Sequence, residues 1–256
     1  MAKQKYSDQN GENVVHMYTP FSYDIGKNYN YRRSGALGSL FFYFLHSLIL
    51  VILYPYFLFV NGLKIVGREN MRAMRGKGVV TVSNHVHIMD SPMLSCAIGF
   101  RRTYYVAAAS NFCIPLVRHF VRGLGGVPIT AAPSQMKYLF SEMNAALAGG
   151  KAVQMYPESV LMPYCDTLRA FKRGAFYMAA EADVPVLPMV FTFRKPRGLL
   201  GRIRKKPFVT LRILPAIYPD SNLKKEQKSI RLRDACFTAM SAVSENVGKE
   251  EEKESA

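Results

Sequence analysis

Cysteine is scarce in this chain of 256 residues, which contains only Cys96, Cys113, Cys165 and Cys236. The four show neither the CxxC spacing of zinc sites nor the density of a disulfide scaffold, and no cleavable signal opens the sequence. This usage excludes a small disulfide-rich secreted protein. It predicts a reducing compartment and no bound metal.

Acidic residues are also few, with 18 Asp and Glu against 34 Lys and Arg, which gives a formal net charge of +16. Such a balance favours an anionic partner, which could be a phospholipid surface, a nucleic acid or a phosphorylated substrate. The chain has no zinc-finger or RNP-type aromatic motif, so we expect no nucleic-acid partner. Residues 194–206 are basic around Leu199, Leu200 and Ile203, a pattern that suits an anionic membrane surface better than nucleic acid.

Charge is missing altogether between Ala36 and Val60. As a helix these residues would extend about 37 Å, which exceeds a hydrocarbon core of roughly 30 Å. The run has no polar face, which favours lipid contact, although a buried core helix is the alternative. Basic residues on both flanks, together with Pro55, favour a bent or hairpin-like insertion into one leaflet over a single crossing.

Short apolar runs alternate with helical patterns after residue 61. The predicted strands are 79–83, 103–107, 127–130, 152–156, 184–192 and 208–214. The predicted helices are 92–98, 112–122, 135–148, 172–181 and 224–247, the third capped by Ser134 and stopped by Gly149-Gly150. This order predicts an α/β fold with a largely parallel sheet covered by helices, behind an N-terminal membrane-embedded helical segment.

The expected organisation has four parts. They are a polar basic segment (1–35), a membrane-inserted helical segment (36–60), an α/β domain (61–247) and a charged, disordered tail (248–256). No internal repeat interrupts the α/β domain. The sequence sets no oligomeric state.

His85 and Asp90 directly follow the predicted strand 79–83. An imidazole can take a proton near neutral pH, and a carboxylate within reach can fix its tautomer and stabilise its charged form. Positions five apart on a straight helix point about 140° away from each other, so the pair can meet only across a loop. Three alternatives stay open: Asp90 as a helix cap near Pro92, a structural His85, or a pairing of Asp90 with His87.

Glu158 follows the predicted strand 152–156, and the carboxyl ends of parallel strands share one edge of a sheet. We therefore expect Glu158 near His85, where it could bind a hydroxyl or orient a neighbour, unless it is simply a loop surface residue. Arg169, Lys172 and Arg173 precede a predicted helix, a place that suits a phosphate group. A solvated basic helix end is the alternative.

Four stretches together resemble the PlsC family of glycerolipid acyltransferases, which includes the 1-acylglycerol-3-phosphate acyltransferases. Asn84-His85 and Asp90 match the NHx4D motif. The other three stretches are Tyr156-Pro157-Glu158, similar to the start of FPEGTR; Phe171-Lys172-Arg173-Gly174-Ala175, similar to FKxGA; and Val184-Pro185-Val186-Leu187-Pro188, similar to VPIxPV. Their order and spacing agree over roughly residues 60–215.

The resemblance implies a membrane-bound O-acyltransferase of phospholipid biosynthesis, at the cytoplasmic face of a bacterial inner membrane. In this family pattern His85 is the base and Asp90 orients it, with oxyanion donors expected among the backbone N–H groups near Pro92. The substrate-binding residues would be Asn84, Glu158, Arg169, Lys172 and Arg173. The acyl donor would be acyl-CoA or an acyl carrier protein thioester, the acceptor a lysolipid, with no bound cofactor. No GxSxG elbow is present, so no covalent acyl-enzyme is expected.

The chain departs from the family at two places. Ser159-Val160-Leu161 stand where the family has Gly-Thr-Arg, and Thr130 stands where an arginine often follows a Gly-x-x-Pro-Ile-like strand. In the family those arginines are understood to hold the acceptor's phosphate. Here Arg169, Lys172 or Arg173 could replace them, or the acceptor could be another lysolipid. A non-enzymatic, membrane-anchored basic lipid-binding protein is the remaining alternative.

Overall fold

The computed structural model describes residues 5–7, 13–15, 25–26, 29–33, 35–113, 115–130, 132–196, 204 and 206–253. Most of the predicted segment 1–35 lies outside these residues, as does most of the basic stretch 194–206. Near the N-terminus, β1 (Lys5–Ser7) and β2 (Asn13–Val15) pair as an antiparallel two-stranded sheet.

A seven-stranded sheet forms the centre of the molecule. Its strands are β3 (Lys64–Val66), β4 (Val79–Ser83), β5 (Thr103–Ala108), β6 (Gly126–Ile129), β7 (Ala152–Met155), β8 (Val186–Arg194) and β9 (Phe208–Ile213). Their order is β3-β9-β8-β4-β7-β5-β6, and of these neighbours only β8 and β9 run antiparallel. The predicted α/β fold with a largely parallel sheet is confirmed. The edge strand β3 was not predicted, because three residues are too few to show a period.

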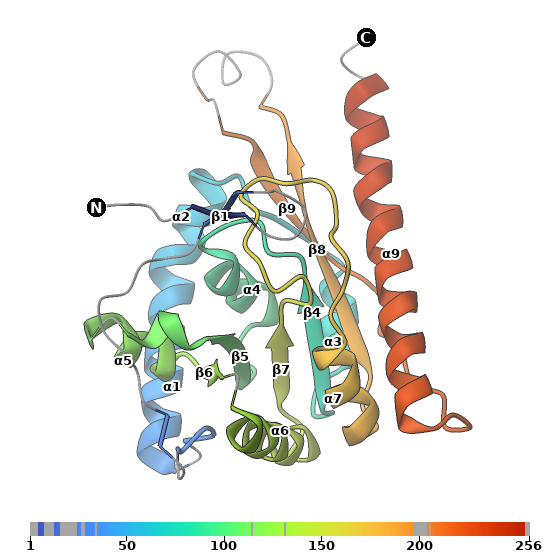
Figure 1. The fold of residues 1–256 in the computed structure, drawn as a ribbon. Helices are drawn as coiled ribbons and strands as arrows, with labels where there is room; N and C mark the ends of the chain where they lie inside the picture. The colour runs from blue at the N-terminus through green and yellow to red at the C-terminus, as the bar shows by residue number, and fades with distance from the viewer. Residues whose placement is uncertain are drawn as a thin grey trace.

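Helices cover both faces of this sheet (Figure 1). They are α3 (Arg68–Ala73), α4 (Asp90–Ile98), α5 (Pro115–Gly123), α6 (Pro133–Ala148), α7 (Gly174–Ala182) and α9 (Lys225–Lys253), with a 3₁₀ turn at Ala109–Phe112. Successive residues of a strand point to opposite faces. Accordingly, Val80 packs in one core cluster with α6, α7 and α9, and Val79 packs in a second cluster with α3 and α4.

The long apolar segment is one continuous helix, made of α1 (Ala36–Leu48), a π-helical turn (Ile49–Leu53) and α2 (Tyr54–Phe59). The hairpin-like form of the prediction is therefore wrong. The π turn directly precedes Pro55, whose ring and missing N–H interrupt the α-helical hydrogen bonds. Within the described residues, this helix alone is long and apolar enough to cross a membrane.

One side of this helix packs along the domain and the other does not. Phe42 and Phe57 are fully buried, and the helix contacts α4 and α5. Its other side exposes large apolar side chains: Leu37, Leu40, Phe44, Val51, Ile52 and Phe59. A helix that is apolar all round, yet covered by protein on one side only, leaves a surface suited to lipid.

Two predicted helix ends differ from the structure. The C-terminal helix α9 runs to Lys253, beyond its predicted end at residue 247, and residues 254–256 lie outside the described part. Glu and Lys are good helix formers, and Glu245 stands four positions before Lys249, a spacing that supports a helix. Helix α6 begins at Pro133 with no side-chain cap, so Ser134 does not cap it, whereas Gly149 ends it as predicted.

Candidate active site

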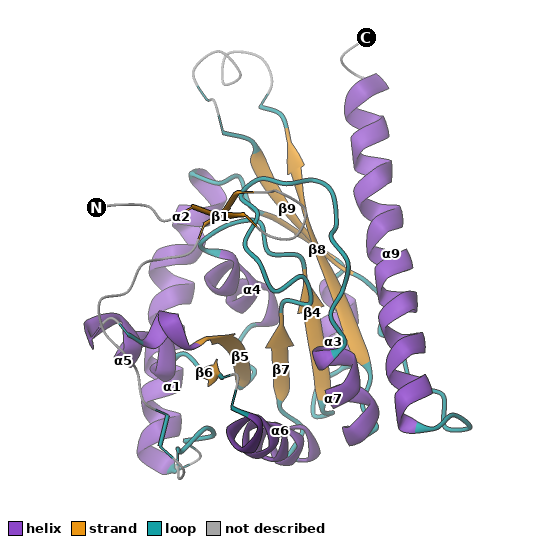
Figure 2. Cartoon of the chain, viewed as in Figure 1, coloured by secondary structure: helices purple, strands orange, loops and turns teal. Residues whose placement is uncertain are grey.

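The site lies where the loops after β4 and β7 meet, at the carboxyl edge of the sheet (Figure 2). The two strands are parallel neighbours, with Val82 paired to Met155. The N–H of Met162 donates to the His85 carbonyl at 2.9 Å, and the N–H of Tyr164 donates to the Val86 carbonyl at 2.9 Å. The second loop is therefore hydrogen-bonded along the first, and the two form one surface.

His85 and Asp90 meet across this loop. The His85 Nδ1 atom lies 2.8 Å from Asp90 Oδ2. The same oxygen accepts the backbone N–H groups of Val86 at 2.8 Å and His87 at 3.0 Å. Asp90 is the first residue of α4, and its side chain turns back to the loop instead of capping the helix. The helix-cap alternative is therefore wrong, and the carboxylate organises the turn that holds His85.

These contacts determine which nitrogen of His85 can act as a base. Asp90 Oδ2 accepts hydrogen bonds from two backbone N–H groups, so this oxygen acts as an acceptor. It therefore also accepts from His85, and the neutral His85 ring carries its proton on Nδ1 and a lone pair on Nε2. The Asp90 side chain is fully buried, while the His85 side chain is 26% exposed. The ring can therefore reach a substrate through Nε2.

Tyr156 fixes the ring from one face, a contact that the sequence pattern did not reveal. Its ring stacks on the His85 imidazole at 4.1 Å and 18°, and its hydroxyl lies 2.8 Å from Ser91 Oγ. Burial, with the charge of Asp90 acting in the same direction, raises the pKa of Tyr156 well above its usual value. The Tyr156 phenol thus stays neutral, and its ring supports one face of the His85 imidazole. The sequence feature that could have indicated this contact is Tyr156 itself, which stands at the first position of the FPEGTR-like stretch.

Glu158 lies beside His85, as the sheet topology predicts. Its Oε2 accepts the His85 N–H at 3.4 Å, and its Oε1 accepts the Arg169 N–H at 3.2 Å. Burial raises the pKa of Glu158, while these two amides act against that increase. The next residue, Ser159, has a φ of 62°, in the left-handed region that favours glycine. Ser159 stands at the position where the family motif has glycine.

Asn84 contacts the neighbouring strand. Its side-chain N–H donates to the Phe191 carbonyl at 2.9 Å, and its carbonyl oxygen accepts the Phe191 N–H at 2.8 Å. The residue is buried. In this structure both polar groups of the side chain are therefore used to fasten the start of the loop that carries His85 to β8.

Two of the three cations before α7 have different surroundings. The Arg173 guanidinium donates to Ser229 Oγ of α9 at 3.2 Å, and Lys172 is exposed.

The start of α4 offers few oxyanion donors. Pro92 has no N–H, and the N–H groups of Asp90 and Met93 are bonded to the carbonyls of His87 and Met89.

His87 shares the loop but uses its ring differently. Its Nδ1 accepts the N–H of Met89 at 3.0 Å, and only its backbone N–H reaches Asp90. Burial lowers the pKa of His87, Asp90 opposes this decrease, and Lys206 adds to it. The side-chain partner of Asp90 is therefore His85.

Potential metal ligands are dispersed in the part of the chain that the structure describes, where no three His, Cys, Asp or Glu side chains gather into a site. The four cysteines are free thiols. Burial raises the pKa of both Cys96 and Cys236 to about 12, so these two thiols stay protonated at neutral pH.

Comparison with known proteins agrees with this geometry. The Acyltransferase family model matches residues 62–192, and the chain belongs to this family. It is 32% identical over 164 residues to a 1-acyl-sn-glycerol-3-phosphate acyltransferase of Chlamydomonas reinhardtii, covering 62% of this chain. It is 28% identical over 188 residues to the human 1-acyl-sn-glycerol-3-phosphate acyltransferase beta, covering 72% of this chain. The matches span 47% and 66% of those two relatives.

The fold has a counterpart among solved structures. The crystal structure of the 1-acyl-sn-glycerophosphate (LPA) acyltransferase PlsC from Thermotoga maritima superposes with a TM-score of 0.54 at 20% identity. The alignment covers 83% of this chain and 95% of that one. The α/β fold of this chain is thus a known one.

Proposed function

We propose that this protein is a membrane-bound O-acyltransferase of phospholipid biosynthesis. It moves a fatty acyl group from acyl-CoA or an acyl carrier protein thioester to the free hydroxyl of a lysophospholipid. The preferred acceptor in this proposal is 1-acylglycerol-3-phosphate. The observation that carries the proposal is the 2.8 Å contact between His85 Nδ1 and buried Asp90. The names of the two curated relatives support the choice of acceptor.

In this mechanism the acceptor hydroxyl is the nucleophile. His85 Nε2 takes the hydroxyl proton as the oxygen attacks the thioester carbonyl carbon, and Asp90 stabilises the imidazolium that forms. The tetrahedral intermediate then collapses, the C–S bond breaks, and the thiolate leaves with the proton from His85. A new ester and a free thiol result, with no acyl-enzyme and no cofactor.

The neighbouring residues have supporting roles in the proposal. Asn84 anchors the loop that carries His85 to β8. Glu158 holds the same loop against the chain segment after β7 and faces the acceptor. Arg169, Lys172 and Arg173 supply positive charge on the approach to the site. Tyr156 keeps the imidazole plane fixed, because a displacement of about 1 Å at the reacting atoms can cost on the order of 10²-fold in rate.

Membrane binding through the apolar helix is the second part of the proposal. One side of the helix packs on α4 and α5 along its length, so a crossing would draw the domain into the bilayer. The exposed apolar side favours insertion parallel to the surface, in one leaflet, with the domain on the cytoplasmic face of a bacterial inner membrane. Phe100 and Phe120 are also exposed and extend the apolar surface.

A panel of acceptors tests the proposal. Purified full-length protein, with one labelled acyl-CoA, is offered lysophosphatidate, lysophosphatidylcholine and lysophosphatidylethanolamine in mixed micelles, and thiol release and labelled product are measured. We expect the greatest turnover with lysophosphatidate, and turnover lowered by roughly 10²–10⁴-fold in His85→Ala. Turnover with another lysolipid only would change the acceptor. Absence of thiol release with every acceptor and with acyl carrier protein thioesters would favour a non-enzymatic lipid-binding protein.

A further inference from the structure

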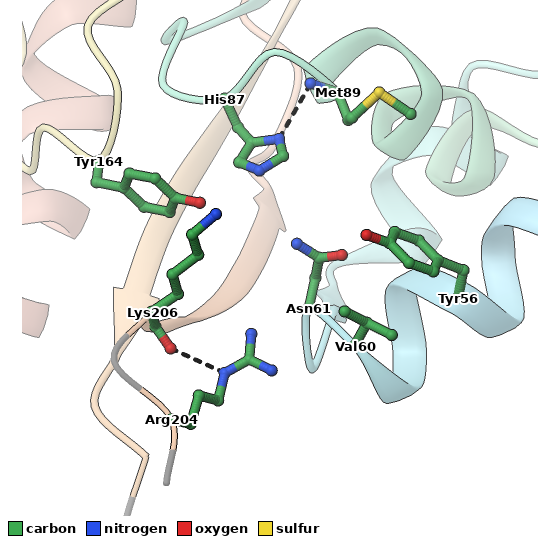
Figure 3. Close-up of a pocket in the computed structure, with 8 residues that line it drawn as sticks. All are labelled: Tyr56, Val60, Asn61, His87, Met89, Tyr164, Arg204 and Lys206. Atoms are coloured by element: carbon green, nitrogen blue, oxygen red, sulfur yellow. Dashed lines mark hydrogen bonds between the residues drawn. The ribbon is translucent and has the colours of Figure 1, made fainter.

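A cavity of about 380 Å³ lies on the His87 side of the catalytic loop. It is lined by Tyr56, Val60, Asn61, His87, Met89, Tyr164, Arg204 and Lys206. In Figure 3 the Tyr164 hydroxyl and the Lys206 ammonium group point toward His87, and Arg204 lies below them. None of the eight lining residues is acidic, and Arg204 and Lys206 bring two positive charges to the walls.

His87 contributes a donor to this cavity. Its Nδ1 already accepts the Met89 N–H at 3.0 Å, so the neutral ring must carry its proton on Nε2. Figure 3 shows that second nitrogen facing the space between Lys206 and Asn61. An N–H donor next to an ammonium group is an arrangement that favours an anion.

The side chains around His87 are held in place before any ligand binds. Tyr164 has a φ of 58°, a strained backbone conformation, and its ring packs 5.6 Å from His87 and 5.4 Å from Phe193. Such strain is concentrated at functional sites. The Arg204 Nε–H donates to the Lys206 carbonyl at 2.8 Å, and the guanidinium lies 4.6 Å from the centre of the Phe208 ring. These two contacts hold the Arg204 side chain at the edge of the cavity.

We propose that this cavity binds a phosphate monoester carried by one of the two substrates, an inference that rests on the proposed function. Lys206, Arg204 and the His87 Nε2–H would hold the phosphate oxygens, with the Tyr164 hydroxyl as a further donor. This site would replace the phosphate-holding arginines that Ser159-Val160-Leu161 and Thr130 lack.

Position favours the acceptor over the donor as the source of that phosphate. Val60 lines the cavity, and the adjoining Phe59 is 84% exposed at the end of the apolar helix. An acceptor whose acyl chain stays in the bilayer would have its headgroup at this level. His87 stands two positions from His85, so a bound headgroup would bring the free hydroxyl toward the base.

Direct binding tests the cavity without any turnover. Isothermal titration calorimetry of the full-length protein uses sn-glycerol 3-phosphate as the acceptor headgroup, adenosine 3′,5′-bisphosphate as the phosphate part of coenzyme A, and glycerol as the uncharged control. Lys206→Gln and Arg204→Gln should each weaken binding of one phosphate probe by about tenfold or more. Lys206→Arg should keep most of the binding. Lys151→Gln, exposed at the amino end of β7, is the matched control and should bind like the native protein.

Kinetics identifies the substrate concerned. If the acceptor supplies the phosphate, Lys206→Gln should raise KM for lysophosphatidate about tenfold or more while kcat and KM for acyl-CoA change little. A rise confined to KM for acyl-CoA would assign the site to the donor. Native-like binding of both phosphate probes by Lys206→Gln and Arg204→Gln, or no binding by the native protein, would overturn the proposal. If no lysolipid is acylated, the calorimetric result still shows whether the cavity binds a phosphate monoester. Failure of the phosphate site can therefore be distinguished from failure of the proposed acyltransferase function.

Discussion

His85 and His87 stand in one loop and both contact Asp90, His85 through its ring and His87 through its backbone N–H, yet their second ring nitrogens have opposite chemistry. The His85 ring donates its Nδ1–H to Asp90, whereas the His87 ring accepts the Met89 N–H at Nδ1. The outward nitrogen of His85 is therefore a base, and that of His87 is a donor. The partner of the inner nitrogen, rather than the residue type, decides what each histidine can do.

Replacing each ring in turn should separate the two roles most clearly. We expect His85→Ala to lower kcat by roughly 10²–10⁴-fold, because it removes the base. His87→Ala should mainly raise KM for the substrate that carries the phosphate. Steady-state kinetics with purified protein measures both. Native-like acyl transfer by His85→Ala, together with its loss in His87→Ala, would reverse the assignment.

Asp90→Asn should remove the negative charge beside His85. The asparagine carbonyl oxygen can still accept the Val86 and His87 N–H groups and the His85 Nδ1–H, so the turn and the tautomer are kept while the charge that stabilises the imidazolium is lost. We expect kcat to fall by roughly 10²–10⁴-fold with little change in fold. Nitrogen-15 NMR of labelled histidine checks that the His85 tautomer is native. An unchanged kcat would show that the charge of Asp90 has no role.

Tyr156 gives His85 a support that His87 lacks, because its ring stacks on His85 at 4.1 Å, whereas Tyr164 meets His87 edge to face. Tyr156→Ala should lower kcat by about 10–100-fold because the imidazole is no longer fixed. Tyr156→Phe keeps the stacking and loses only the bond to Ser91, so its kcat should fall by no more than a few-fold. If the two variants lost equal activity, the hydroxyl and not the ring would be the important part.

The contact between His85 and Asp90 was predictable because the residues that form it are close in sequence. A buried five-residue run fixed β4, and Pro92 marked a helix start, so only a loop could join His85 to Asp90. The choice between His85 and His87 stayed open in the residues alone, because spacing permits either to reach Asp90. It is settled by where the two side chains point, which depends on the turn that Asp90 itself organises.

The cavity beside His87 was not predictable, because its walls come from distant parts of the chain. Tyr56 belongs to the apolar helix, Tyr164 to the loop after β7, and Lys206 to the segment before β9. No spacing in the sequence indicates that they meet. The basic stretch 194–206 did predict an anionic partner, but its two described cations near β9 face a cavity next to the catalytic loop.

The smallest expected effect is on the pH dependence of the free energy of unfolding. It isolates the contribution of His87 protonation from that of other titrating groups. Burial lowers the pKa of His87 below its ordinary value of 6.5 in the folded protein. The unfolded chain therefore binds more protons near and below pH 6.5, and the native protein loses stability as the pH falls through that range.

His87→Asn should remove this loss. Its melting temperature, compared with that of the native protein, should be relatively higher at pH 5.5 than at pH 7.5, by on the order of 1 °C after solvent screening is allowed for. The raised pKa of Glu158 acts in the opposite sense, but it is common to both proteins and cancels in the comparison. Thermal unfolding followed by circular dichroism measures the difference. If His87→Asn lost stability in acid as steeply as the native protein, protonation of His87 would not be the cause of the loss.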